Sequence, residues 1–142
     1  MPEFGILMTD WAHEHGRLSR IRRAVFIEEQ GVPEDLEWDI DDTGAVHLLA
    51  LDDAGRAIGC ARLLPDGHIG RMAVLPDWRG RGVGRALLDA VTLEAQTRGH
   101  RSLHLSAQIH AAGFYARAGF VAVGDEYEEA GIPHVAMHKT LT

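Results

Sequence analysis

Apolar and polar positions alternate along the chain with two different periods, which indicate where helices and strands lie. Apolar residues at helical spacing, such as Leu18, Ile21 and Val25, predict helices over residues 17–29, 82–98 and 109–118. Short apolar or alternating stretches predict strands over residues 4–8, 45–51, 57–64, 68–75, 102–107, 120–127 and 134–140. Helices and strands therefore occur throughout the sequence, which favours an α/β fold.

Two turn signals connect three neighbouring strands in the middle of the chain. D-D-A-G-R at 52–56 and P-D-G at 65–67 are typical of tight turns, because Pro fixes φ and Gly tolerates positive φ. The three strands are predicted to form an antiparallel meander, and residues 68–107 a central strand–helix–strand unit. We expect a single domain over residues 1–142, with a mixed, mostly antiparallel sheet of six to seven strands flanked by helices.

Composition and charge exclude several classes of protein. The chain has 142 residues, of which 46% are apolar, which suits one domain with a real core. Its net charge of −7 argues against a general nucleic-acid binder. No apolar run approaches the ~18 residues of a membrane span, and the first residues lack the pattern of a secretion signal. We expect a cytoplasmic protein that binds neither membrane nor nucleic acid.

The sequence offers little for thiol or metal chemistry. Cys60 is the single cysteine, so no internal disulfide can form, and it lies in the apolar run 58–64. We expect it to be a small buried residue. No spacing of His, Cys, Asp and Glu resembles a metal site, so no metal cofactor is expected.

A turn rich in glycine and arginine precedes the second predicted helix. The segment R-G-R-G-V-G-R covers residues 79–85. The first amides of a helix lack intrahelical partners and carry partial positive charge, and glycines let an anion approach them closely. Arginine side chains add fork-shaped donors for phosphate oxygens. The segment fits neither the Walker nor the Rossmann glycine pattern, yet it predicts a site for a phosphate-rich ligand such as a pyrophosphate.

This turn resembles the Q/R-x-x-G-x-G/A signature of the GNAT superfamily of N-acetyltransferases. Downstream, Q-I-H-A-A-G-F-Y-A-R-A-G-F at 108–120 is similar to the family's N-x-x-A-x-x-x-Y-x-x-x-G-F segment, with Gln108 where many members have Asn. R-x-x-V-F-I-x-E-Q-x-V-P at 22–33 and E-A-G-I-P-H at 129–134 resemble a bacterial subgroup of unassigned substrate. The resemblance spans nearly the whole chain.

The resemblance implies that acetyl-CoA is the acetyl donor and that its pyrophosphate lies on the glycine turn. The implied phosphate-binding residues are Arg79, Gly80, Arg81, Gly82, Val83, Gly84 and Arg85. The implied partners of the pantetheine arm are the backbone of Met72, Ala73 and Val74, which pairs with it as with an added strand, and Gln108. A backbone N–H near Val74 is the expected donor to the developing oxyanion.

The resemblance also implies an acid and a base for transfer to a primary amine. Tyr115 is the expected general acid for the leaving thiolate. The general base stays open among Glu28, Glu29, Asp39, His104, His134 and a chain of waters. Glu29 is preferred because it lies in the E-Q-x-V-P segment near the expected acceptor, and His134 is the next candidate and a candidate substrate-binding residue.

Residues 34–42 contain six carboxylates in nine positions. They could form a solvated loop, or a lip that attracts a cationic amine acceptor, either a small molecule or a peptide. Two other functions remain open: a non-catalytic acyl-CoA sensor or regulatory module, and an acyl-homoserine-lactone synthase, although such enzymes are usually longer. Pairing of exposed sheet edges could form a homodimer.

Overall fold

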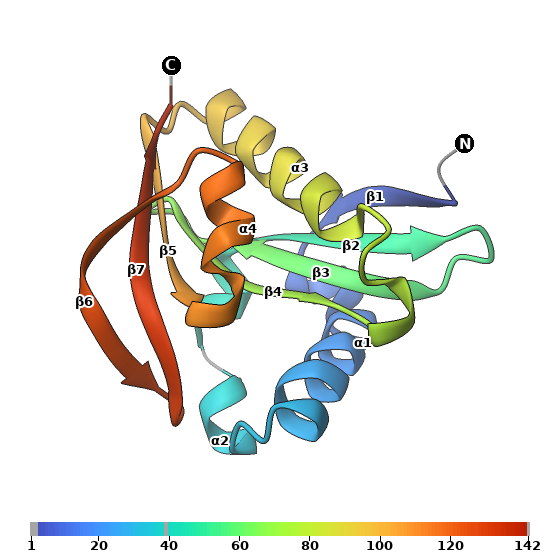
Figure 1. The fold of residues 1–142 in the computed structure, drawn as a ribbon. Coiled ribbons are helices and arrows are strands. Elements are labelled where there is room, and N and C mark those ends of the chain that lie inside the picture. The colour runs from blue at the N-terminus through green and yellow to red at the C-terminus, as the bar shows by residue number, and fades with distance from the viewer. Residues whose placement is uncertain (1–2, 39, 142) are drawn as a thin grey trace.

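Seven strands form one sheet in this computed structural model, which describes residues 3–38 and 40–141 (Figure 1). The order across the sheet is β1-β2-β3-β4-β5-β7-β6, and β4 and β5 run parallel while the other neighbouring pairs are antiparallel. The strands are β1 (Phe4–Thr9), β2 (Val46–Asp52), β3 (Ala57–Leu63), β4 (His68–Val74), β5 (Ser102–Gln108), β6 (Val121–Glu129) and β7 (Ile132–Thr140). The predicted α/β class and the mixed, mostly antiparallel sheet are confirmed.

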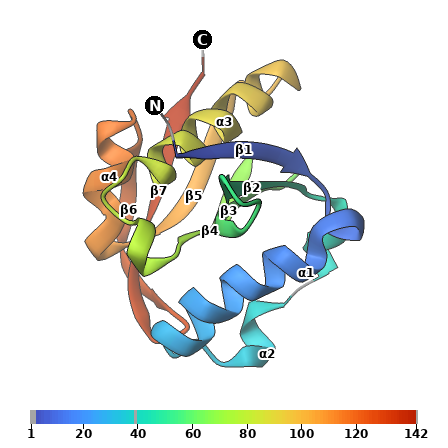
Figure 2. The ribbon, with the colours of Figure 1, turned by 90° about the vertical axis from the view of Figure 1, so that its right-hand side faces the viewer.

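Two helices cover opposite faces of the sheet, as Figures 1 and 2 show. Helix α3 (Val83–Thr97) packs on β2, β3 and β4, and α1 (Trp11–Arg22) packs on the other face of β3. The short helix α4 (Ala112–Arg117) follows β5 and contacts β6. The central strand–helix–strand unit β4–α3–β5 therefore has the predicted form.

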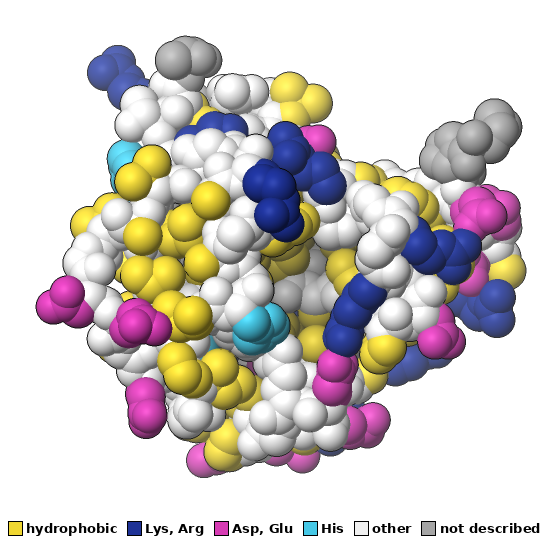
Figure 3. Space-filling model, in the orientation of Figure 1, with side chains coloured by type: hydrophobic (Ala, Val, Ile, Leu, Met, Phe, Trp, Pro, Cys, Tyr) yellow, Lys and Arg dark blue, Asp and Glu magenta, His cyan; other side chains and the backbone are white. Residues whose placement is uncertain are grey.

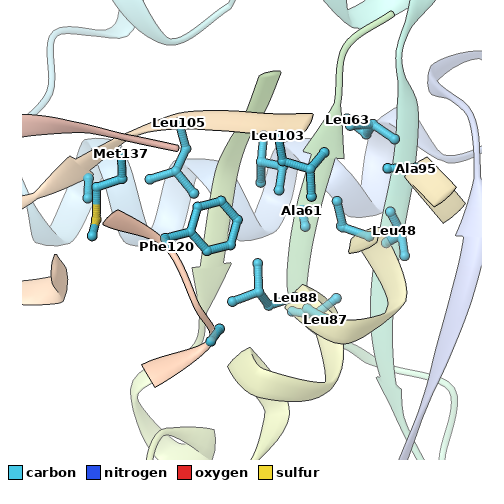
Figure 4. Packing of buried hydrophobic residues seen from close by; sticks show 14 of the residues in the cluster. Leu48, Ala61, Leu63, Leu87, Leu88, Ala95, Leu103, Leu105, Phe120 and Met137 are labelled. Carbon is cyan, nitrogen blue, oxygen red and sulfur yellow. The ribbon is translucent and has the colours of Figure 1, made fainter. Parts of the chain in front are cut away.

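The main core lies between α3 and the sheet (Figure 4). Leu87, Leu88 and Val91 of α3 are at most 1% exposed, because the helix presents one apolar stripe to the strands. A smaller core on the other face packs Leu18 and Ile21 of α1 against β2 and β3. Two separate apolar layers thus fix the sheet between two helices.

The first helix differs from the sequence prediction. It begins at Trp11 rather than at residue 17, and the Asp10 carboxylate caps it by accepting from the His13 N–H at 2.9 Å. Its continuation Arg23–Glu29 is π-helical, and the Gln30 N–H donates to the Val25 carbonyl five residues back. The segment therefore reaches residue 29 as predicted, but with a wider helical turn at its end.

The acidic segment combines exposed and buried carboxylates. It contains a short helix, α2 (Glu34–Glu37), and a 3₁₀ turn, Ile40–Gly44, while Asp39 lies outside the described residues. Glu37 and Asp42 are each 2% exposed. The solvated loop therefore describes Glu34, Asp35 and Asp41, which are exposed, but not Glu37 and Asp42, which are buried against arginines, and the lip stays a prediction.

These two carboxylates and three arginines form a buried ion network. Arg22 donates from Nε to Glu37 at 2.7 Å and from Nη1 to Asp42 at 2.8 Å, and it is 1% exposed. Arg62 pairs with Asp42 at 3.0 Å, and Arg71 with Glu37 at 3.0 Å. Burial raises the pKa of Glu37 above its usual value. The network ties the end of α1 to α2, β3 and β4.

The sheet ends in two edge strands, β1 and β6. Strand β6 is exposed along its whole length, and Val121 and Val123 are 67% and 56% exposed. Figure 3 shows apolar side chains gathered on the left of the face drawn there. Homodimer formation through a sheet edge stays a prediction.

We expect Arg22→Ala to lower the free energy of unfolding by about 3–5 kcal/mol, because it leaves two buried carboxylates without their shared cation. The measurement is urea unfolding followed by circular dichroism. Arg23→Ala is the matched control, because Arg23 pairs with Glu34 on the surface and such pairs contribute little. Equal effects of the two variants would contradict the structural role of the network.

Candidate active site

The wedge, a V-shaped opening between β4 and β5, is the central feature of the site. The two strands pair only at His68 with His104 and at Ile69 with Leu105. Past these pairs the strands separate, so the β4 edge from Met72 to Val74 faces a cleft instead of β5. An extended ligand segment could hydrogen-bond to that edge as an added strand.

A bulge in β4 accompanies this separation. Between its pairs with β3, β4 has one residue more than β3, because Arg62 lies opposite Gly70 while Cys60 lies opposite Ala73. Arg71 has a φ of 49°, a left-handed conformation that a residue with a side chain seldom adopts. At this bulge the Arg71 Nε lies 3.0 Å from the Glu37 carboxylate, and β4 and β5 are no longer paired.

The cleft has a volume of about 1260 Å³, large enough for an extended ligand of cofactor size. Its walls come from the end of the π-helical segment, β4, the glycine turn, β5, α4 and the β6–β7 hairpin. The face drawn in Figure 3 is hollowed near its middle, with basic side chains around the hollow. The cleft thus brings together segments that are far apart in the sequence.

The glycine turn lies at one end of the cleft and leads directly into α3. Gly80 and Gly82 have φ values of 73° and 86°, which favour glycine. A Cβ on either would meet nothing within 4 Å, so the turn borders open space at both glycines. Gly82 is the N-cap of α3 and supplies no side-chain cap for the first amides. The residues present therefore fit a phosphate group at this helix N-terminus.

All three arginines of the turn have carboxylate partners. Arg79 forms a bidentate pair with Glu29, at 2.7 Å and 2.6 Å, and its Nε donates to the Val74 carbonyl at 2.9 Å. Arg81 pairs with Glu3 and lies over the Trp78 ring. Arg85 pairs with Asp89 one helical turn away. Arg79 and its partner Glu29 both line the cleft.

Tyr115 of α4 lies beside the β4 edge. Its hydroxyl donates to the Met72 Sδ at 3.6 Å, and its ring packs edge-to-face against Phe114 and Phe120. Burial raises the pKa of Tyr115 to about 12. The hydroxyl therefore stays protonated at neutral pH and can donate a proton next to β4.

The base candidates have very different surroundings. The hydrogen bond from Arg79 lowers the pKa of Glu29, which makes this carboxylate a weaker proton acceptor than a free one. Glu28 is exposed and does not line the cleft. His104 lies at the paired end of β5, edge-to-face with His68, also outside the cleft lining. Asp39 lies outside the described residues.

His134 lines the cleft from β7 and is 6% exposed. Its Nδ1 lies 2.6 Å from the Ile132 carbonyl, which only accepts, so Nδ1 carries a proton. Its Nε2 lies 3.6 Å from the Glu129 carboxylate, and the Tyr127 ring stacks on the imidazole. His134 is thus held in one orientation on the wall of the cleft that β7 contributes.

Several cleft residues were missed by sequence reasoning. Glu37, Arg62 and Arg71 line the cleft as parts of the buried ion network. The available signal was the occurrence of two arginines inside otherwise apolar strands. Gln30 was also missed, and it accepts a hydrogen bond from the Gln108 side chain at 2.8 Å.

Thiol and metal chemistry find no support in the described residues. Cys60 is 1% exposed, its Sγ donates to the Arg71 carbonyl, and burial raises its pKa to about 12. The expectation of a small buried cysteine is confirmed. Within residues 3–38 and 40–141, no cluster of His, Cys, Asp and Glu could hold a metal ion, and no helix is long and apolar enough to cross a membrane.

Comparisons with known proteins agree with this architecture. The family model described as "Acetyltransferase (GNAT) domain" matches residues 12–141. The chain is 37% identical to Protein ElaA of Escherichia coli (strain K12) over 134 residues, which covers 87% of this chain and 86% of that protein.

Two solved structures extend the similarity to three dimensions. An acyl-CoA N-acyltransferase from Pseudomonas aeruginosa has a TM-score of 0.86 and 32% identity, over 96% of this chain and 99% of that one. The crystal structure of Escherichia coli ElaA has a TM-score of 0.84 and 28% identity, over 95% and 99% of the two chains. The similarity therefore covers the sheet, the helices and the cleft together.

We expect Cys60 to be unreactive in the folded protein, because its thiolate is disfavoured by burial and its sulfur is shielded. Mixing with Ellman's reagent at pH 8 should release almost no colour until urea unfolds the chain, after which one thiol should react. Rapid reaction in native buffer would contradict the burial of Cys60. The same inertness gives a low background when free CoA is measured with this reagent.

Proposed function

Because the chain belongs to the acetyltransferase (GNAT) domain family, we propose that it transfers the acetyl group of acetyl-CoA to a primary amine. Members of this family carry out acyl-CoA-dependent acyl transfer, and the chain is an acyltransferase on that ground. The acetyl group, the amine and the direct attack of the amine on the thioester are the proposed details. The single observation that carries the proposal is the cleft that connects the α3 N-terminus with Tyr115.

The proposed donor site runs along this cleft. Backbone amides from Gly80 to Gly84 bind the pyrophosphate at the α3 N-terminus, where the helix dipole favours negative charge. The β4 edge from Met72 to Val74 pairs with the pantetheine arm. Gln108, on the opposite wall, contacts the arm or the backbone beside it. Acetyl-CoA supplies an activated thioester when bound.

The proposed chemistry uses groups at the middle of the cleft. A backbone N–H near Val74 donates to the thioester oxygen as charge develops on it. The Tyr115 hydroxyl donates its proton to the sulfur that leaves. Its raised pKa of about 12 means that the hydroxyl is protonated throughout the neutral range, although burial also makes it a weaker acid. The hydroxyl position beside Met72 of β4 supports this assignment.

The proposed acceptor is a small-molecule or peptide amine that enters from the side of Glu29 and His134. Glu29 remains the proposed base, but its pairing with Arg79 must change before it can accept a proton. His134 is proposed to contact the amine substrate, since its Nε2 and the carboxylate of the neighbouring Glu129 can accept hydrogen bonds from an ammonium group.

The experiment that tests the function is release of free CoA thiol from acetyl-CoA in the presence of amines, polyamines, aminosugars and peptides with free N-termini. Amine-dependent release, with the acetylated amine identified by mass spectrometry, is the expected result. CoA binding measured by calorimetry, without transfer to any amine, would instead favour a non-catalytic acyl-CoA-binding module.

We expect Tyr115→Phe to lower kcat by roughly 10²-fold or more, because a positioned general acid contributes about 10²–10⁴-fold. The affinity for CoA should be largely kept, since the ring still packs against Phe114 and Phe120. Tyr127→Phe is the matched control, because it removes the same atom from the other tyrosine, whose hydroxyl contacts Ser106 rather than β4, and it keeps the ring that stacks on His134.

The pH dependence provides a second check on the same assignment. With the pKa of Tyr115 at about 12, its acid form persists across neutral pH, and activity that depends on it is lost only as pH approaches that value. An unchanged kcat in Tyr115→Phe at all pH values would remove this residue from the acid role.

A further inference from the structure

Arg79 contacts residues of both the proposed donor site and the proposed acceptor site. It lies in the glycine turn, next to the proposed phosphate site, yet its guanidinium holds Glu29, which is 50 positions away in the sequence. Its Nε also holds the carbonyl of Val74, on the strand proposed to pair with the pantetheine arm. In this state one side chain binds both a proposed acceptor-side carboxylate and a proposed donor-side backbone group.

Gln30, the residue after Glu29, contacts the opposite wall of the cleft. Gln30 accepts a hydrogen bond from Gln108 of β5, and the Gln108 oxygen accepts one from His110. The end of the π-helical segment therefore contacts the glycine turn through Glu29 and the end of β5 through Gln30. Two adjacent residues thus bridge the open end of the wedge.

We propose that Arg79 exchanges the Glu29 carboxylate for a phosphate oxygen of the bound acyl donor, and that this exchange frees Glu29 to bind the ammonium group of the acceptor. The inference rests on the proposed function and adds a coupling between its donor and acceptor sites. Arg79 is then a positioning residue that prepares Glu29 only after the donor has arrived.

The geometry and charge of the pair favour such an exchange. A guanidinium fork matches a carboxylate or a phosphate equally well, but a bidentate pair with one leaves few donors for the other. The Arg79 and Glu29 side chains are 42% and 39% exposed, so water reaches both groups and lowers the cost of exchanging one anion for another. A diphosphate carries more charge than a carboxylate and also meets the α3 amides.

Release from Arg79 changes the pKa of Glu29 and leaves its negative charge unpaired. The hydrogen bonds from Arg79 keep the pKa of Glu29 low, so their loss moves this pKa upward and improves the carboxylate as a proton acceptor. The same loss leaves a negative charge at the acceptor side of the cleft, where it attracts an ammonium group. The Val74 carbonyl is released as well and can accept from the donor's amide.

The test is isothermal titration calorimetry with CoA, which needs no known acceptor. Glu29→Gln should bind CoA roughly two- to fivefold more tightly than the native protein, because an exposed ion pair no longer has to break. Glu28→Gln is the matched control: it removes the same charge from the adjacent, exposed position outside the cleft lining. It should change CoA affinity little.

Arg79→Gln separates the exchange from simple charge repulsion. Removing a carboxylate near a diphosphate could tighten binding even without any exchange. The gain from Glu29→Gln should therefore shrink toward that of the Glu28→Gln control when residue 79 is glutamine. An equal gain in both backgrounds, or no gain in Glu29→Gln, would overturn the inference.

A second measurement follows Glu29 directly. Its side-chain carboxyl carbon, titrated by NMR, should show a midpoint that moves upward when CoA is bound, and an unchanged midpoint would also overturn the exchange. Failure of every variant and of the native protein to bind CoA would instead overturn the proposed function itself, and the inference with it. The two failures are therefore distinguishable.

Discussion

The loss of hydrogen bonding between β4 and β5 is the constraint on which the rest of the site depends. Backbone N–H and C=O groups inside a sheet normally pair, so two adjacent strands that separate leave an edge needing other partners. The extra residue at the β4 bulge and the left-handed Arg71 accompany this separation. The Arg79 side chain already supplies one substitute donor, to the Val74 carbonyl. A ligand that supplies more would complete the strand.

The buried ion network gives the bulge a rigid support. Arg71 donates to both the backbone and the carboxylate of Glu37, and Glu37 is held in turn by Arg22. Burying these charges is costly, and the cost is offset only when each charge has well-placed partners. The network therefore ties the position of the bulge to the end of α1, from which the π-helical segment leads to Glu29. One buried cluster thus orients both walls of the cleft.

The sequence predicted the sheet well because short strands and tight turns leave local signals. The start of α1 was missed because Trp11 to Gly16 contains no apolar repeat at helical spacing, although Asp10 is a recognisable N-cap. The π-helical turn was missed as well, because no spacing of apolar residues in the sequence distinguishes it from an α-helical turn. The buried carboxylate Asp42 looks like exposed Asp41 in the sequence, because its partners Arg22 and Arg62 are 20 residues away in either direction. Long-range pairing, not composition, decides which acidic residue is buried.

The same reasoning explains why the resemblance points to a definite donor site but leaves several candidates for the base. A phosphate site made of backbone amides depends on glycines and a helix start, which are contiguous in sequence. The basicity of Glu29 depends on whether Arg79 is its partner, and that contact joins residues 50 positions apart. In the proposed reaction the Glu29 carboxylate has two states: a guanidinium holds it in one, and it faces an ammonium group in the other. Whether Glu29 can act as the proposed base therefore depends on a long-range pair with Arg79 that its neighbours in the sequence do not reveal.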